Sequence, residues 1–204
     1  NYPIRCMDLM KRIIDISQKR EQKLSLDFLS KNNNLIAPHG GVLINSKASI
    51  DESQNLSELK TLEVSYSVLL DCEQIAVGTY SPLQGMMTKS ELNSVLDNMK
   101  LENGSVWTMP VLLQVDKVQA NFFNIGEEIF LKDSNNKIYS KITISDISEI
   151  DLDVVSKKWF GTRSKDHPGV FKFMNSGNWI IGGNVKLVNK LKSNFPEYTM
   201  EPKQ

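Results

Sequence analysis

Residue types that could support catalysis gather in one short segment near the end of the chain, GTRSKDHPGV at residues 161–170. It contains Arg163, Lys165, Asp166 and His167, and His167 is one of only two histidines. A histidine with a carboxylate partner can act as a general base, and nearby cations can bind an anionic substrate. Asp166 and His167 do not form such a pair by adjacency alone, because successive side chains usually diverge.

The same segment has the composition of a turn. A proline and a glycine follow His167, and both residue types favour tight turns. In such a turn the imidazole would hydrogen-bond nearby backbone, and we favour this interpretation over a catalytic one. The other histidine, His39, precedes the pair Gly40-Gly41 and is interpreted in the same way. We therefore predict no catalytic residue in this chain.

Other kinds of site find little support in the sequence. No G-x-x-x-x-G-K-[ST] or G-x-G-x-x-G segment is present to bind phosphates. Cys6 and Cys72 are far apart and no Cys-x-x-Cys spacing exists, so we expect neither a metal site nor a redox pair. Trp107, Trp159 and Trp179 could stack on bases, but large aromatic side chains more often anchor a core or an interface.

Charge and hydropathy exclude further classes of protein. Lys+Arg and Asp+Glu both number 24, so the formal net charge is zero and no overall electrostatic attraction favours nucleic acid or an acidic membrane. No apolar run approaches the roughly twenty residues that a membrane span needs. We expect a cytoplasmic protein.

The elements that position these residues can be read from local patterns. Thr88 and Glu91 have the spacing of a capping box and predict the start of a helix. An earlier strand leads into a helix that Ser65 would cap and Gly78 would end. A further short helix, capped by Asp151 or Asp153, should lead into the segment at residues 161–170.

The middle and end of the chain are rich in strand patterns. PVLLQV at residues 110–115 predicts a buried strand, and residues 127–145 predict a hairpin that turns at Asn135-Asn136. NWIIGGNVKLVN predicts a strand bent or bulged at Gly182-Gly183. Short strands with glycine corners and peripheral helices predict an α+β domain built on a small, partly closed β-barrel.

The first 34 residues have a different pattern. The chain opens on Asn1-Tyr2-Pro3, and apolar residues then recur at helical spacing through CMDLMKRIIDIS. A polar stretch follows and ends in three asparagines, which marks a boundary near residue 34. We expect residues 1–34 to be an amphipathic helix and linker from the end of an upstream domain, followed by a second domain at residues 35–204.

Six segments stand in order between residues 35 and 197: LIAPHGGVLIN, DCEQIAVGTYSPLQGMM, NSVLDNMKLENGSVWTMPVLLQV, FGTRSKDHPGV, IIGGNVKLV and FPE. This ordered series resembles the N-terminal domain of ATP sulfurylases (sulfate adenylyltransferases). The resemblance implies a PUA-like fold, a pseudo-barrel with helices. Two motifs depart from the family, which usually has Thr-Asp where this chain has Arg163-Ser164, and Gly-Phe-Met where it has GMM.

The resemblance also implies where the chemistry lies. ATP sulfurylases transfer the adenylyl group in a second domain, with a Gln-x-Arg-Asn stretch and a His-x-x-His pair, and neither pattern occurs in this chain. The chain would therefore be a non-catalytic accessory domain, inactive alone, that packs against a catalytic domain of the same polypeptide and could form a homo-oligomer. It would hold no cofactor, and ATP and Mg²⁺ would bind only the parent enzyme. Arg163, Lys165 and His167 would then form an interface loop facing the catalytic domain.

Two alternatives stay open. NYPIRCMDLMKRI at residues 1–13 is similar to the last barrel helix of pyruvate kinases, so the domain could be a regulatory or assembly module fused behind a pyruvate-kinase-like barrel. A PUA-type module could also bind RNA, although the neutral net charge does not favour nucleic acid.

Overall fold

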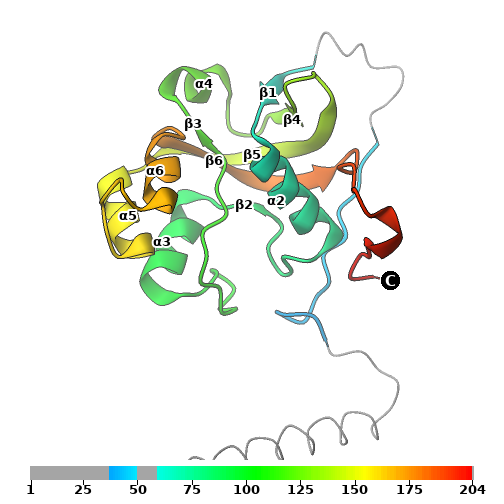
Figure 1. The fold of residues 1–204 in the computed structure, drawn as a ribbon, viewed down its shortest axis with the longest axis horizontal. Coiled ribbons are helices and arrows are strands. Elements are labelled where there is room, and N and C mark those ends of the chain that lie inside the picture. The colour runs from blue at the N-terminus through cyan, green and yellow to red at the C-terminus, as the bar shows by residue number, and fades with distance from the viewer. Residues whose placement is uncertain (1–36, 50–58, 204) are drawn as a thin grey trace, which may run out of the picture. The chain divides into compact units, whose positions relative to one another are not determined.

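The computed structural model of the protein describes residues 37–49 and 59–203 (Figure 1). The amphipathic helix predicted in residues 1–34, the boundary near residue 34 and the segment similar to pyruvate kinases lie outside these described residues. In the described part of the chain, no helix is long and apolar enough to cross a membrane.

A six-stranded sheet forms the centre of the domain (Figure 1). Its strands are β1 (Thr61–Glu63), β2 (Gly85–Met86), β3 (Gln114–Val115), β4 (Glu128–Lys132), β5 (Ile138–Glu149) and β6 (Trp179–Leu187). The order is β1-β4-β5-β6-β2, and β3 also pairs with β6. β1 runs parallel to β4, and the other pairs are antiparallel.

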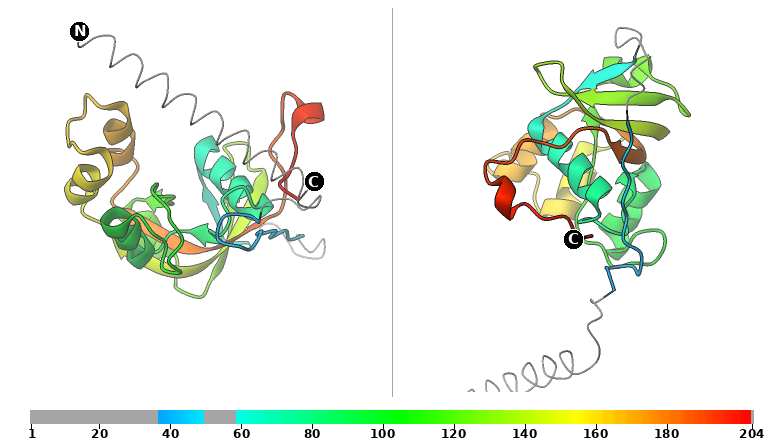
Figure 2. Two further views of the ribbon diagram at one scale, coloured as in Figure 1. Left: turned by 90° about the horizontal axis from the view of Figure 1, so that it is seen from below. Right: turned by 90° about the vertical axis from the view of Figure 1, so that its right-hand side faces the viewer.

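Several helices pack against the sheet, which makes the domain α+β. They are α2 (Tyr66–Val77), α3 (Lys89–Asn98), α4 (Lys117–Phe122), α5 (Leu152–Phe160), α6 (Pro168–Met174) and the 3₁₀ helix η2 (Pro196–Tyr198). The sheet is curved, and α2 lies on its concave side (Figure 2).

Most of the predicted helix and turn signals are confirmed. Thr88 and Glu91 form both bonds of the capping box at the start of α3, and Asp151 caps α5. Gly78 ends α2 in the left-handed conformation, and Ser65 precedes that helix, although its side chain makes no capping hydrogen bond. The β4–β5 hairpin turns at Asn136, which has a φ of 63°.

Two elements differ from the sequence prediction. Residues 110–115 form a regular strand only at Gln114–Val115, because the segment divides its hydrogen bonds between two neighbours: Val111 O accepts from Met87 N, and Leu113 O accepts from Ile181 N. α4 was not predicted, although its signal is local. Asp116 and Gln119 form a second capping box at its start.

The predicted irregularity at Gly182-Gly183 is confirmed. The β5–β6 register shifts between Ile144 and Asp146, which face Gly183 and Gly182 respectively, so Ser145 is the additional residue of a bulge on β5. A Cβ atom on Gly182 would stand 2.7 Å from the Cα of Thr88. Only glycine lets β6 approach the start of α3 this closely.

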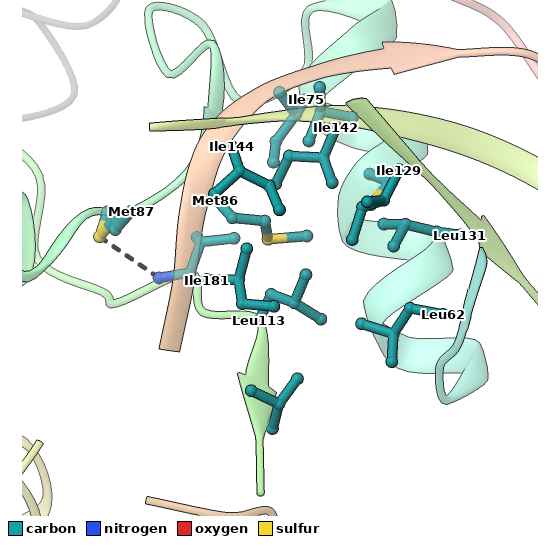
Figure 3. Packing of buried hydrophobic residues seen from close by; sticks show 14 of the residues in the cluster. Leu62, Ile75, Met86, Met87, Leu113, Ile129, Leu131, Ile142, Ile144 and Ile181 are labelled. Carbon is teal, nitrogen blue, oxygen red and sulfur yellow. Dashed lines mark hydrogen bonds between the residues drawn. The ribbon is translucent and has the colours of Figure 1, made fainter. Parts of the chain in front are cut away.

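Among the buried apolar clusters of the described residues, the two largest hold these layers together. The larger cluster packs α2 against the sheet, and Figure 3 shows Leu62, Ile75, Leu113 and Ile181 converging in it. The smaller cluster joins α3, α5 and α6 to β6 through Leu92, Ile150, Val155, Phe173 and Ile180. The second cluster fixes the α5–α6 pair, and with it the loop that carries the predicted interface residues.

Candidate functional site

The predicted interface loop connects α5 to α6 on the surface of the domain. Arg163, Lys165 and His167 are all exposed. Nδ1 of His167 accepts hydrogen bonds from the backbone N–H groups of Gly169 at 3.2 Å and Val170 at 3.3 Å. The prediction that this imidazole bonds nearby backbone is confirmed, but the residues after it begin a helix instead of forming an isolated turn. A proline at the first helical position is the local signal for that helix.

The contacts of the loop leave no general-base pair. The Oγ of Ser164 donates to Oδ2 of Asp166 at 2.9 Å, while the ring of His167 lies against the ring of Phe160 with centroids 5.3 Å apart. Within the described residues, Arg163 and Lys165 have no ion-pair partner. The loop therefore presents two cations to solvent on a framework that His167 and Phe160 stabilise.

His39 is also committed to backbone. Its Nε2 lies 2.7 Å from the carbonyl oxygen of Val106, so this ring nitrogen donates to that oxygen. The predicted turn around His39 is present, because Gly41 N donates to Pro38 O at 2.8 Å. The two histidines lie in separate parts of the domain, and neither is oriented by a carboxylate.

A groove of about 450 Å³ lies beside the α5–α6 pair and was not predicted from the sequence. Its walls come from β1 and the first two turns of α2, from residues 110–115 and Gln119, and from the end of α5 together with α6. Trp159 and Phe160 stack with centroids 4.5 Å apart, and Phe173 meets Trp159 edge to face at 5.6 Å. These three rings make one wall of the groove aromatic.

Polar groups also line the groove. Burial raises the pKa of the Asp71 carboxyl, while the Tyr80 hydroxyl, which donates to its Oδ1 at 3.3 Å, and the nearby Lys172 ammonium lower that pKa in part. Lys172 Nζ also donates to Ser67 Oγ at 3.1 Å, which links α6 to α2. Gln114 is fixed because its Nε2 donates to the carbonyl oxygens of Phe173 and Gly177.

Candidate metal ligands and nucleophiles are scarce among the residues that the structure describes. Among the described residues, no group of three or more His, Cys, Asp or Glu side chains could hold a metal ion. Cys72 is fully buried on α2, and burial raises the pKa of its thiol to about 12. A small polar hollow of about 180 Å³ contains the carboxylates of Glu91 and Glu102, but Glu91 is already used in the capping box of α3.

Comparison with known proteins adds evidence about the family. A family model described as PUA-like domain matches residues 36–190. Sulfate adenylyltransferase from Persephonella marina is 36% identical over 83% of this chain and 46% of its own length. The sulfate adenylyltransferase from Pyrococcus abyssi is 33% identical over 81% of this chain and 44% of its own length. A probable bifunctional SAT/APS kinase from Sorangium cellulosum is 33% identical over 82% of this chain and 30% of its own length.

One solved structure resembles the fold. The hexameric APS kinase from Thiobacillus denitrificans aligns with a TM-score of 0.59 at 23% identity and covers 83% of this chain and 30% of that chain. The chain described here therefore spans less than half the length of these relatives, while most of its own residues are matched.

Proposed function

Because the chain belongs to the PUA-like domain family, we propose that it is the non-catalytic accessory domain of a sulfate adenylyltransferase-type protein and packs against a catalytic domain. The observation that carries the proposal is the uneven coverage. More than four fifths of this chain matches the relative from Persephonella marina, and it accounts for 46% of that relative. The remaining half of such a protein would carry the adenylyl transfer.

The contacts within the domain support a non-catalytic role. Adenylyl transfer requires preorganised cations and hydrogen-bond donors around the phosphates of ATP. Arg163 and Lys165 stand on an exposed loop, and the Nδ1 atom of His167 is occupied by two backbone amides. The described residues do not fit an ATP–Mg²⁺ site, and we assign ATP and Mg²⁺ to the catalytic half.

The exposed cations of the loop support an interface. Arg163 and Lys165 have no ion-pair partner among the described residues, and His167 holds the loop on the start of α6. We assign these three residues to the contact with the catalytic domain.

The curved sheet, with β1 at one end of its strand order, supports the pseudo-barrel form of the PUA-like fold. We also expect a homo-oligomer, since a structural neighbour is described as hexameric. We expect the protein to lie in the cytoplasm.

An activity assay tests the proposal. The purified chain should form no ATP from adenylyl sulfate and pyrophosphate, and its background should match that of a heat-denatured sample. In a longer polypeptide that also contains a catalytic half, Arg163→Glu with Lys165→Glu should weaken the association of the two halves after proteolytic cleavage between them. Val154→Glu, an exposed change on α5, is the matched control and should leave association unchanged. Turnover by the chain alone would contradict the proposal.

A further inference from the structure

Strand β1 has a free edge within the part of the chain that the structure describes. Its one strand partner there is β4, to which it is parallel. Lys60 O accepts from Phe130 N at 2.9 Å, and Val64 N donates to Lys132 O at 3.0 Å. Because the backbone groups of successive residues point to opposite sides of a strand, those of Thr61 and Glu63 point away from β4.

Two hollows lie along this free edge. One is the groove of about 450 Å³, and the other has a volume of about 380 Å³ and lies between β1 and α4. Leu62, Glu63 and Gln119 line both hollows, so the two are adjacent. Residues 112–115, which end in β3, form the facing wall of the groove. Among the described strands, β1 and β3 do not pair with each other, so the curved sheet is open between them. Figure 1 shows both strands beside α4.

The hollows offer apolar surface on both sides of the edge. Trp159, Phe160 and Phe173 line the groove, while Val118 and Phe122 on α4 line the second hollow and are 80% and 62% exposed. A polypeptide that adds to a sheet edge sends alternate side chains to opposite faces. One set of its side chains would enter the groove, and the other set would contact α4. A small molecule would fill the hollows, but it would not form hydrogen bonds to the row of backbone groups between them.

Charge limits the kind of segment that can bind. Glu63 and Asp71 line the groove against one ammonium, that of Lys172. Glu63 has no ion-pair partner among the described residues. An acidic side chain entering the groove would face two carboxylates, whereas a basic or uncharged one would be accepted.

We propose that the free edge of β1 binds an extended segment of another polypeptide, which adds to the sheet as a strand. Its side chains are apolar at alternate positions, and none of those facing the groove is acidic. The backbone of Thr61 and Glu63 supplies the hydrogen bonds, and the aromatic groove and α4 select the side chains. This inference does not depend on the proposed function, because it concerns only the edge and its two hollows.

Selection from a phage-displayed library of random heptapeptides tests the proposal. The 204-residue chain is the target, and its Thr61→Pro variant is used to remove peptides that bind elsewhere. Proline at an edge position removes an outward N–H group without breaking the ladder to β4. We expect enriched peptides with alternating apolar residues. The most enriched peptide, synthesised as the probe, should slow hydrogen exchange of the Thr61 and Glu63 amides by at least about tenfold.

Variants complete the test. Phe122→Asp should weaken binding of the probe by at least about tenfold, because it places a charge in the second hollow. Tyr198→Asp, an exposed change on η2, is the matched control and should keep the affinity within about twofold. The proposal is wrong if no peptide is enriched over the Thr61→Pro background, or if the probe binds without slowing these two amides. If Thr61→Pro does not fold, Phe122→Asp takes its place in the counter-selection, and the exchange measurement decides.

Discussion

Gly183 on β6 lies so close to Thr143 on β5 that a Cβ atom on the glycine would stand 2.1 Å from the carbonyl oxygen of Thr143. No side chain fits at that distance. The close approach lies beside the bulge at Ser145, where β5 and β6 change register. β5–β6 is the longest strand pair of the sheet, so this contact lies in its most extensive ladder.

The first prediction follows from this contact. Gly183→Val should destabilise the domain by several kcal/mol or prevent folding, because a backbone oxygen cannot move aside without breaking the β5–β6 ladder. Asn184→Val changes the adjacent, exposed position on the same strand and should alter stability by no more than about 0.5 kcal/mol. Urea unfolding followed by circular dichroism measures both. Equal unfolding midpoints for the two variants would show that the approach is not needed.

His167 should behave as a helix cap. His167→Ala removes the acceptor of the Gly169 and Val170 amides and should cost about 0.5–2 kcal/mol of unfolding free energy. His167→Asn keeps a short acceptor at the same position and should recover most of that loss. Thermal unfolding of the two variants makes the comparison. If asparagine is no better than alanine, packing of the ring on Phe160 accounts for the role of this histidine.

Acid stability should depend on Glu127. The Lys60 ammonium, together with Asn124, lowers the pKa of this carboxyl from 4.5 to about 2. A folded-state pKa below the unfolded value stabilises the protein above the unfolded pKa, and this contribution is lost as the pH falls from about 4.5 to about 2. In Glu127→Gln the unfolding free energy should therefore fall less steeply across that range.

The partner variant provides the check. Lys60→Met removes the largest cause of the shift and should raise the pKa of Glu127, measured by NMR titration of its side-chain carbon. Urea unfolding at intervals from pH 5 to pH 2 gives the slope for each protein. If the slopes of the original chain and Glu127→Gln coincide, the carboxyl is not coupled to folding.

Cys72 should be chemically inert while the domain is folded. Its thiol is buried and its pKa is raised to about 12, so the reactive thiolate is scarce at neutral pH. In a Cys6→Ser variant, Cys72 is the single thiol of the chain. A thiol reagent such as dithiobis(nitrobenzoate) should label it slowly in buffer and at once in denaturant. Rapid labelling under native conditions would mean that α2 opens readily from the sheet.

Several features of the fold could be predicted because their causes are local. The capping box of Thr88 and Glu91, the left-handed end of α2 at Gly78 and the turn at Asn136 each depend on residues within a few positions of one another. The same kind of signal was present for α4 and α6, in the Asp116 and Gln119 spacing and in the proline that follows His167. The imidazole of His167 was also predicted correctly to bond nearby backbone, although the residues after it begin α6 instead of an isolated turn.

The amino-acid sequence by itself indicated most of the helices and strands and the glycine corner of the sheet. The tertiary structure alone decided which of these elements meet. The groove unites Leu62, Asp71, Gln114, Trp159 and Lys172, which lie far apart along the chain. Whether a strand has one neighbour or two also depends on pairing across the whole sheet, and no local pattern encodes that β1 pairs with β4 alone among the described strands. The physical reason is that long-range packing selects among strand pairings that local propensities leave equally favourable.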